Sequence, residues 1–319
     1  MSEILRVEHL KKYFNVPAGT LHAVDDVTFS INEGETLGVV GESGCGKSTL
    51  GRTVLKLIDP TDGKIYFQGE DITNISKNEN REMRRQMQII FQDPFSSLNP
   101  RFCVEDLIAD PLKTFGKMNK KEIHEKVMEI MDLVGLSRRY AYSYPHELDG
   151  GRRQRIGIGR ALALEPKFIV CDEPVSALDV SIQAQILNLL QDLQDKHNFT
   201  YIFVTHDLSV VKHISTDILV MYIGVMVEKC PAKELFAMPL HPYTKGLLSA
   251  IPVPNIHHEK KRVALQGELS SPIDPKEECR FVKRCPYATD LCKCKRPDYQ
   301  EVLPNHFVAC HHVKEINQL

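Results

Sequence analysis

A nine-residue stretch near the N-terminus, GESGCGKST (residues 41–49), has the residue types and spacing of a phosphate-binding loop. It fits the pattern G-x-x-x-x-G-K-[ST], in which glycines let the backbone wrap around a phosphate group. Lys47 is expected to reach the β- and γ-phosphate oxygens of a nucleotide, and the Ser48 hydroxyl to ligate Mg²⁺. The residues predicted to hold the nucleotide in this loop are Gly41, Ser43, Gly44, Cys45, Gly46, Lys47, Ser48 and Thr49.

Two carboxylates follow a hydrophobic run in FIVCDEP (168–174). The run predicts a strand, and an open α/β sheet places its ligands at the carboxyl ends of such strands. Asp172 is expected to hold the Mg²⁺ shell and Glu173 to polarise an attacking water. An acidic pair at a strand end is common, so this prediction depends on the phosphate-binding loop in the same chain.

Two more polar residues follow predicted strands, Gln92 in IIFQDP (89–94) and His206 in YIFVTHD (201–207). Gln92 either orders a Mg²⁺-bound water, as a metal-site residue, or simply begins a loop. His206 is either a catalytic group or a structural hydrogen-bonding histidine. Residue types alone leave these alternatives open.

A second candidate phosphate contact is LDGGRRQR (148–155), where two glycines lead into a predicted helix. A helix start presents backbone N–H groups and a positive dipole end to an anion. Asp149, immediately before the glycines, would repel that anion. The stretch is therefore either a weakened phosphate site or a helix start capped by aspartate.

Hydrophobic periodicity predicts the elements that position these residues. Alternating apolar residues predict antiparallel strands over 4–10 and 23–31, and short apolar runs predict buried strands over 36–41, 168–171 and 201–205. Helical spacing of apolar residues predicts two amphipathic helices. Their faces are Ile123, Val127, Ile130 and Val134 in one helix, and Ile182, Ile186, Leu189 and Leu193 in the other.

The predicted fold class is α/β, a P-loop nucleotide-binding domain with a mostly parallel core sheet and an N-terminal antiparallel β subdomain. This domain is expected to span residues 1–237, with an inserted helical subdomain at about 92–153. Prolines at and beyond residue 239 indicate that the chain then leaves the main domain. Residues 238–319 are expected to form a C-terminal extension with a cysteine-rich, metal-binding segment at 279–310.

Composition narrows the class of protein. The 319 residues carry a formal net charge of −2, which gives no global reason to expect a nucleic-acid partner. No apolar run is long enough to suggest a membrane span, and the start MSEILRVEHLKK lacks the apolar core of a signal peptide. The chain is therefore expected to stay in the cytosol, where clustered cysteines favour metal binding over disulfides.

Taken in order, GESGCGKST, IIFQDP, LDGGRRQR, FIVCDEP, SALD (176–179) and VTHD (204–207) resemble the nucleotide-binding subunit of ABC transporters over about residues 1–235. The resemblance implies ATP and Mg²⁺ as ligands and ATP hydrolysis as the reaction. It implies that Gln92 is the Q-loop glutamine, Glu173 the catalytic base and His206 the switch histidine. Phe14, or alternatively Tyr13, would stack on adenine, unless the aromatic is a core residue of an edge strand.

The signature segment departs from the family pattern LSGGQ, whose serine and glycine N–H groups bind the γ-phosphate held by the opposite subunit. Here Asp149 replaces the serine and Arg152 the glutamine. A carboxylate accepts hydrogen bonds but donates none, so the contact is weakened. We therefore expect an asymmetric heterodimer with a second ATPase, whose nucleotide faces Leu148, Asp149, Gly150, Gly151 and Arg152 of this chain.

The C-terminal extension has a narrower resemblance. LHPYTKGLLSAIP (240–252) and ECRFVKRCPYATDLCKCKRP (278–297) are similar to ATPases of the dipeptide/oligopeptide importers, a group that includes nickel importers. The resemblance implies a peripheral subunit at the cytoplasmic face of the membrane, with two permeases and an extracytoplasmic substrate-binding protein. A nickel or glutathione importer remains an alternative, as do a soluble ABC ATPase and a largely regulatory ATP-binding subunit.

Four cysteines in the extension have spacing suited to one inorganic centre: Cys279, Cys285, Cys292 and Cys310. They would supply thiolates to a [4Fe–4S] cluster or to Zn²⁺. The family resemblance favours the cluster. His311 and His312 leave mixed ligation open, and free thiols are the remaining alternative.

Overall fold

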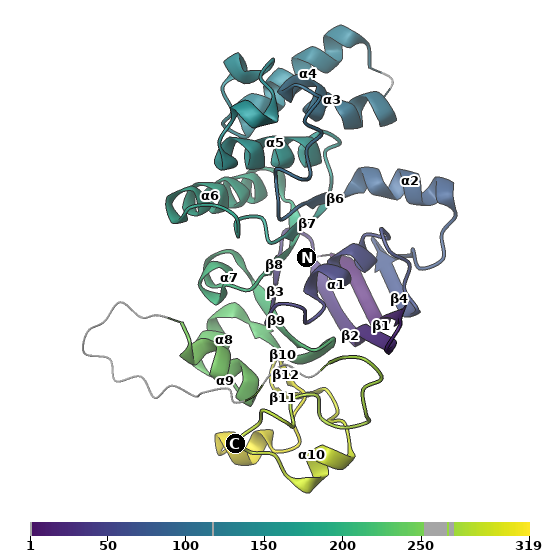
Figure 1. Ribbon diagram of the computed structural model, residues 1–319, viewed down its shortest axis with the longest axis vertical. Helices are drawn as coiled ribbons and strands as arrows, with labels where there is room; N and C mark the ends of the chain where they lie inside the picture. Colours follow the sequence, from purple (N-terminus) through teal and green to yellow (C-terminus); the bar gives the residue numbers. More distant parts are fainter. Residues whose placement is uncertain (1, 117, 252–266, 268–270) are drawn as a thin grey trace, which may run out of the picture. The chain divides into compact units, whose positions relative to one another are not determined.

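The computed structural model describes residues 2–116, 118–251, 267 and 271–319 (Figure 1). The chain forms two compact units, which are described separately below. One consists of Met1–Asn74 together with Phe203–Leu319, and the other of Ile75–Ile202. The first unit thus brings the two ends of the sequence into one body.

The first unit begins with an antiparallel sheet of four strands in the order β2-β1-β4-β5. Buried and exposed residues alternate along the second half of β2, where Val27, Phe29 and Ile31 are buried. This alternation is typical of a sheet with one solvated face, and it confirms the strands predicted at both positions. The strands are β1 (Glu3–Val16), β2 (Gly19–Asn32), β4 (Asp62–Phe67) and β5 (Glu70–Asp71).

The same unit contains a parallel strand pair beside the phosphate-binding loop. β3 (Thr36–Val40) is buried at every residue and pairs in parallel with β9 (Asp217–Tyr222). Full burial is expected of a strand covered on both faces. β10 (Val225–Pro231) continues the sheet by antiparallel pairing with β9. The helices of this part are α1 (Lys47–Val54), α7 (Leu208–Ile214) and α8 (Ala232–Ala237).

The C-terminal extension returns to this sheet. β12 (His306–Val308) pairs with β10, and β11 (Gln300–Leu303) pairs with β12, so the strands β9, β10, β12 and β11 lie in sequence across the sheet (Figure 1). Local periodicity does not indicate this pairing, because the strands are short and their partner lies about eighty residues earlier. The helices of the extension are α9 (Pro242–Ser249), α10 (Asp290–Cys294) and α11 (Val313–Asn317).

The second unit combines helices with the parallel pair β6 (Met87–Ile90) and β7 (Phe168–Asp172). In α4 (Lys120–Leu133) the predicted face is buried, including Val127 and Ile130. The remaining helices are α2 (Lys77–Gln86), α3 (Val104–Phe115), η1 (Arg138–Tyr140), η2 (Pro145–Glu147), α5 (Gly150–Leu162) and α6 (Val180–His197).

One predicted helical face is only partly buried. In α6 Ile186 and Leu193 are buried as predicted, Ile182 and Leu189 are half-buried, and Leu190 is buried as well. Leu189 and Leu190 both follow Ile186 at helical spacing, by three and four residues, so packing decides which of them is covered.

β8 (Thr200–Thr205) is buried throughout and carries the chain from the second unit into the first. None of the helices in the described part of the chain is long and apolar enough to cross a membrane.

Candidate functional site

The phosphate-binding loop joins β3 to α1, as the sequence predicts. Gly46 caps α1 with a φ of 101°, a left-handed conformation that favours glycine. A Cβ atom at Gly46 would lie 2.0 Å from the carbonyl oxygen of Ala23, so a larger residue cannot fit. Ser43 and Gly44 at the tip are exposed, and Ser48 and Thr49 in the first turn of the helix are half-buried.

Lys47 closes the loop from within. Its Nζ donates hydrogen bonds to the carbonyl oxygens of Gly41, at 2.8 Å, and Glu42, at 2.9 Å. The side chain is 4% exposed, and burial raises the pKa of the neighbouring Cys45 thiol, which stays protonated. The ammonium group is thus held inside the turn that the family pattern assigns to the phosphates.

The two candidate adenine-stacking residues occupy different environments on β1. The Tyr13 ring stacks on His22 with centroids 3.8 Å apart, and its hydroxyl donates to Asp25 at 2.5 Å. Phe14 is half-buried, with Lys12 Nζ 4.9 Å from its ring centroid. Neighbouring strand residues point to opposite faces, so Phe14 does not share the contacts that engage Tyr13.

His206 follows β8 directly and is exposed. The next residue, Asp207, caps α7 by accepting a hydrogen bond from the Ser209 N–H at 2.7 Å. The strand end and the cap together fix the backbone on both sides of the histidine.

In the second unit, β7 delivers Asp172 and Glu173 at its carboxyl end. Asp172 is 1% exposed, and Glu173 is half-buried with a φ of 48°. Positive φ is uncommon for a residue other than glycine and clusters at functional positions. Gln92, two residues after β6, donates a hydrogen bond from Nε2 to Glu173 Oε2 at 3.1 Å. Two of the predicted catalytic residues are therefore in direct contact.

The signature segment begins α5, and Asp149 is its N-cap. Its Oδ1 accepts the Arg152 N–H at 2.8 Å, and its Oδ2 pairs with Arg152 Nη1 at 2.5 Å. Leu148 is buried at 4% exposure, whereas Gly150 is half-buried. Gly151 packs against α6, because a Cβ there would lie 2.7 Å from Ile182 Cγ2.

The four cysteines proposed as ligands lie in one region of the extension. Cys279 donates its backbone N–H to the carbonyl oxygen of Cys292 at 2.9 Å. Burial first, and then the charges of the neighbouring Cys292, Cys310 and Cys285, raise the pKa of Cys279 to about 12. Cys294, in contrast, is exposed.

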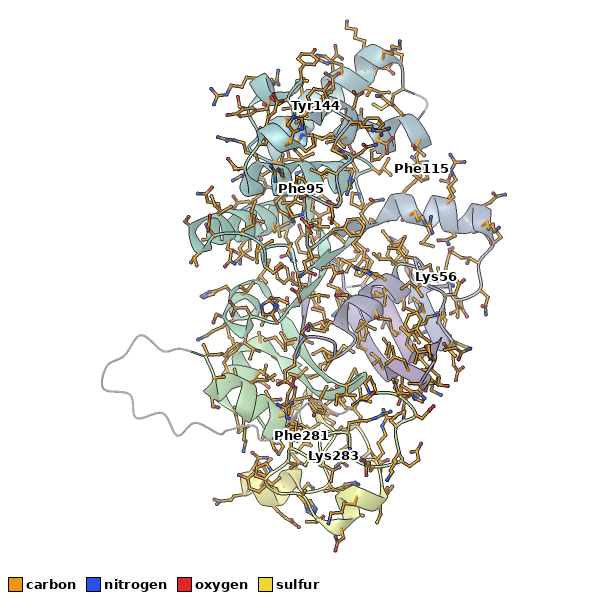
Figure 2. All side chains as sticks on the ribbon, viewed as in Figure 1. Lys56, Phe95, Phe115, Tyr144, Phe281 and Lys283 are labelled. Atoms are coloured by element: carbon orange, nitrogen blue, oxygen red, sulfur yellow. The ribbon has the colours of Figure 1, made fainter. Side chains whose placement is uncertain are left out.

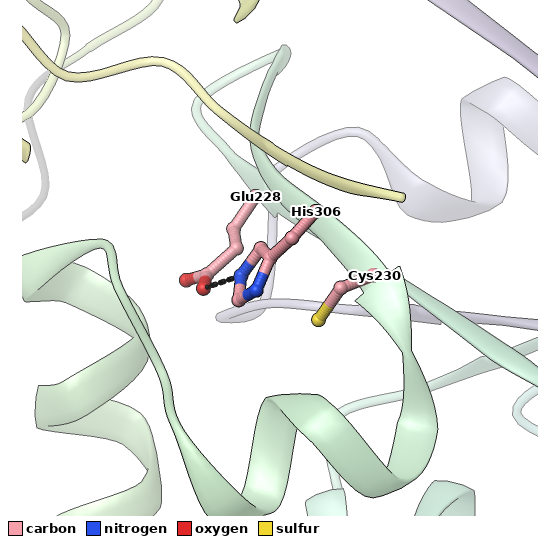
Figure 3. A group of neighbouring side chains, drawn as sticks. All are labelled: Glu228, Cys230 and His306. Carbon is pink, nitrogen blue, oxygen red and sulfur yellow. Dashed lines mark hydrogen bonds and ion pairs between the residues drawn. The ribbon is translucent and has the colours of Figure 1, made fainter. Parts of the chain in front are cut away.

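A separate buried group of polar side chains fastens the extension to β10 (Figure 3). Glu228 accepts hydrogen bonds from the Leu240 and His241 N–H groups and from His306 Nε2, at 2.7, 3.0 and 2.7 Å. Cys230 lies beside them, and burial raises its thiol pKa. Because the carboxylate is already satisfied and the thiol is protonated, we interpret this group as structural rather than metal-binding.

Glu42, inside the phosphate-binding loop, contacts two residues of the extension that sequence reasoning did not single out. Arg284 pairs with its carboxylate, and the Tyr243 hydroxyl accepts its N–H. Both contact Phe281, which is labelled in Figure 2: the Tyr243 ring packs against its ring, and the Arg284 N–H donates to its carbonyl oxygen. The sequence does contain a signal for this contact, because an acidic residue in a phosphate-binding loop is expected to need a cationic partner.

Comparisons with known proteins give one family for most of the chain. Residues 24–176 match the model described as ABC transporter, and residues 227–292 match the oligopeptide/dipeptide transporter C-terminal region. The chain is 50% identical over 97% of both chains to the oligopeptide transport ATP-binding protein AppF of Bacillus subtilis. It is 51% identical to the oligopeptide transport ATP-binding protein OppF of Salmonella typhimurium, over 94% of this chain and 90% of that one.

Solved structures agree. The dimeric post-hydrolysis structure of the ATP-binding cassette MJ0796, bound to ADP and Pi, superposes with a TM-score of 0.66 at 28% identity. It covers 72% of this chain and 99% of that one. The α/β fold with a P-loop is thereby confirmed, and the chain belongs to the ABC transporter ATPases, in their oligopeptide/dipeptide branch.

Proposed function

We propose that this chain is the ATP-hydrolysing subunit that energises import of di- and oligopeptides from the cytoplasmic face of a membrane. Its proposed partners are a second ATPase subunit, two permeases and an extracytoplasmic substrate-binding protein. The observation that carries the proposal is the 50% identity to an oligopeptide transport ATP-binding protein over 97% of each chain. The matched C-terminal region supports the same branch.

We also propose a division of the chain into two parts. Residues 1–237 form the ATPase domain, with the helical part at 92–153, and residues 238–319 form the extension. The end of α8 at Ala237 supports this boundary.

In this proposal each site residue has a distinct role. Gly41, Ser43, Gly44, Cys45 and Gly46 surround the phosphates with backbone N–H groups, and Lys47 neutralises their charge. Ser48, Gln92 and Asp172 would hold Mg²⁺, which when bound supplies a positive charge to the developing phosphate oxyanion. Glu173 accepts a proton from the attacking water and is oriented by the hydrogen bond from Gln92. His206 contacts the γ-phosphate, and Phe14 stacks on the adenine.

The function is tested by reconstituting the chain with its candidate permeases and second ATPase in liposomes, with the binding protein added outside. We expect uptake of radiolabelled peptides that requires ATP inside the vesicles. Glutathione and chelated nickel are offered in parallel. Uptake of either of these without peptide uptake would overturn the peptide assignment while keeping the ATPase role, and ATP hydrolysis without uptake of any of the three would contradict the importer role.

We further propose that the two ATP sites of the complex are unequal. The Asp149 cap supports this, because its carboxylate already accepts a hydrogen bond from the Arg152 N–H in the first turn of the helix. An ionised carboxylate about 4 Å from a phosphate oxygen is repelled by about 1 kcal/mol in water and by several times more in a dehydrated interface. A partner's nucleotide facing this segment is therefore held weakly, whereas the site built on this chain's own P-loop is intact.

The inequality is tested by replacing the catalytic base of one subunit at a time. Glu173→Gln in this chain should nearly abolish ATP hydrolysis by the complex. The matching change in the second ATPase should cost much less. Equal losses from the two changes would remove the asymmetry without affecting the assignment of the family.

Finally, we propose that Cys279, Cys285, Cys292 and Cys310 hold a [4Fe–4S] cluster. Burial raises the pKa of Cys279 and of Cys310, to about 12 and about 11, so bare thiolates are disfavoured unless an inorganic cation compensates them. Four sulfurs on one Zn²⁺ lie about 3.8 Å apart, given Zn–S bonds of about 2.3 Å. Among the described residues no three cysteine sulfurs lie within 4.8 Å of one another, so the thiols as placed do not form a ready-made Zn²⁺ site.

The cluster is tested by anaerobic purification. We expect a brown protein absorbing near 400 nm, with about four iron and four sulfide per chain. Cys292→Ser should remove this absorbance, whereas Cys294→Ser, its exposed neighbour on α10, should not. A colourless protein containing one zinc would contradict the cluster.

A further inference from the structure

The phosphate-binding loop of this chain contains a negative charge at its second residue. Glu42 follows Gly41, and its carbonyl oxygen accepts a hydrogen bond from Lys47 at 2.9 Å. Its backbone is thus part of the turn that surrounds the lysine. A free carboxylate here would repel the phosphate groups that the loop exists to bind.

Arg284, in the C-terminal extension, pairs with this carboxylate through two hydrogen bonds. Nη1 lies 2.6 Å from Oε2, and Nη2 lies 3.0 Å from Oε1. The Arg284 side chain is 7% exposed and that of Glu42 is 27% exposed. A paired fork of this kind fixes orientation as well as charge, and burial protects it from screening by salt.

A second residue of the extension holds the backbone of Glu42. The Tyr243 hydroxyl accepts the Glu42 N–H at 2.9 Å. Tyr243 is fully buried, and its ring contacts Tyr222 and Phe281 with centroids 4.7 and 5.5 Å away. Phe281 also accepts the Arg284 N–H on its carbonyl oxygen, at 3.0 Å. Arg284 and Tyr243 are therefore linked by one aromatic cluster.

We propose that Arg284 and Tyr243 are positioning residues for ATP binding, through which the C-terminal extension sets the affinity of this chain's own P-loop. Arg284 cancels the charge of Glu42 and orients its side chain, and Tyr243 fixes the N–H of the same residue. Neither residue touches the nucleotide; both act through Glu42. The inference depends on ATP binding alone and is independent of the transported substrate and of any cluster at the cysteines.

A second arginine of the extension provides a matched control. Arg280 pairs with the buried Asp25, which also pairs with Arg296 at 3.1 Å. The Arg280 side chain is 8% exposed, close to the 7% of Arg284. It also joins the extension to the N-terminal part of the unit, but its carboxylate partner lies on β2 outside the phosphate-binding loop. Loss of either arginine removes a buried ion pair, and only one of these pairs belongs to the loop.

The experiment measures the equilibrium dissociation constant of MgATP for the full-length chain, by calorimetry, beside its melting temperature. Arg284→Met should raise the Kd at least about tenfold, because a carboxylate left uncompensated repels the phosphates. Raising the salt concentration should reduce this difference. Arg280→Met should also lower the melting temperature, by a smaller amount because Arg296 still pairs with Asp25, and should leave the Kd near that of the unmodified chain.

Rescue separates charge compensation from general damage. In the double variant Arg284→Met with Glu42→Gln, affinity should return to within about threefold of the unmodified chain, because no charge is left unpaired. Tyr243→Phe should raise the Kd by a few-fold, since it removes only the acceptor of the Glu42 N–H. If Arg284→Met does not fold, Arg284→Lys tests the fork alone, and a Kd raised at least about threefold supports the proposal.

Two results would overturn it. One is an unchanged Kd in a folded Arg284→Met or Arg284→Lys chain. The other is a loss of affinity that Glu42→Gln does not restore, or that Arg280→Met reproduces, because the extension would then serve stability rather than the nucleotide.

Discussion

Asp149 uses both of its carboxylate oxygens on Arg152, one on the backbone N–H and one on the guanidinium. Aspartate is a good N-cap, so the helix start is stable without any ligand. The same geometry occupies a donor that an anion would otherwise receive. At the scale of single residues, the Asp149 cap and a partner's phosphate therefore compete for the same donor, the Arg152 N–H.

This competition predicts the effect of two substitutions at position 149. In the assembled complex, Asp149→Ser should raise ATP turnover roughly two- to tenfold, because removing a repulsion of about 1 kcal/mol or more changes a rate by that order. Steady-state phosphate release by the reconstituted complex measures it.

Asp149→Asn is the matched control, since asparagine caps a helix as well as aspartate but carries no charge. Equal acceleration by serine and asparagine would assign the effect to charge. An unchanged rate in both would leave Asp149 as a cap only and contradict the brake.

A motif that ties a side chain to the end of a strand or the start of a helix predicts its position from the sequence. Lys47 begins α1, Gln92 and Glu173 follow β6 and β7, and the last two contact each other; their roles stay predictions. The contact between Glu42 and Arg284 was not predictable, because the two residues are 242 positions apart and neither belongs to a periodic pattern. The charge of Glu42 signals that it needs a partner, without indicating where that partner lies.

At the scale of elements, α5 and α6 meet at the second glycine of the signature. A Cβ at Gly151 would lie 2.7 Å from Ile182 Cγ2, well inside van der Waals contact. Gly157 lies further along α5, and a Cβ built there would have no atom within 4 Å. Two glycines in one helix therefore have opposite packing environments.

Alanine substitution should separate them. Gly151→Ala should destabilise the chain by about 1–3 kcal/mol through overpacking. Gly157→Ala should be neutral or stabilising by up to about 1 kcal/mol, because alanine favours the helix. Thermal or urea unfolding of the purified chain measures both changes.

The cause of the Gly151 effect can be checked by removing the opposing methyl group. Ile182→Leu lacks the Cγ2 methyl group on the β-carbon and should recover part of the loss in the Gly151→Ala background. Equal effects of the two alanine substitutions would contradict the packing argument.

An element could be predicted from the sequence when it was long enough to show a hydrophobic repeat. The helix at 180–197 was located correctly, yet Leu190 rather than Leu189 is buried, because both satisfy a helical repeat. β11 and β12 are four and three residues long, too short for periodicity to identify. Their pairing with β10 depends on tertiary contacts such as the buried Glu228–His306 pair (Figure 3).

At the scale of the whole molecule, the described part of the C-terminal extension contacts the rest of the first unit at several places. Strand β12 pairs with β10, Arg280 and Arg296 pair with Asp25, and Arg284 pairs with Glu42. Prolines and cysteines in the sequence predict a change in character from about residue 238. They gave no sign that the chain returns to the phosphate-binding loop, since long-range pairing leaves no local pattern.

The separation of Glu42 from Arg284 also orders events during synthesis. The loop leaves the ribosome 242 residues before its arginine partner does. At ordinary elongation rates this is a delay on the order of ten to fifty seconds. Throughout it, the nascent chain carries an uncompensated carboxylate in its P-loop, and a prematurely terminated product never gains the compensating arginine. Full nucleotide affinity is thus reserved for chains translated beyond Arg284.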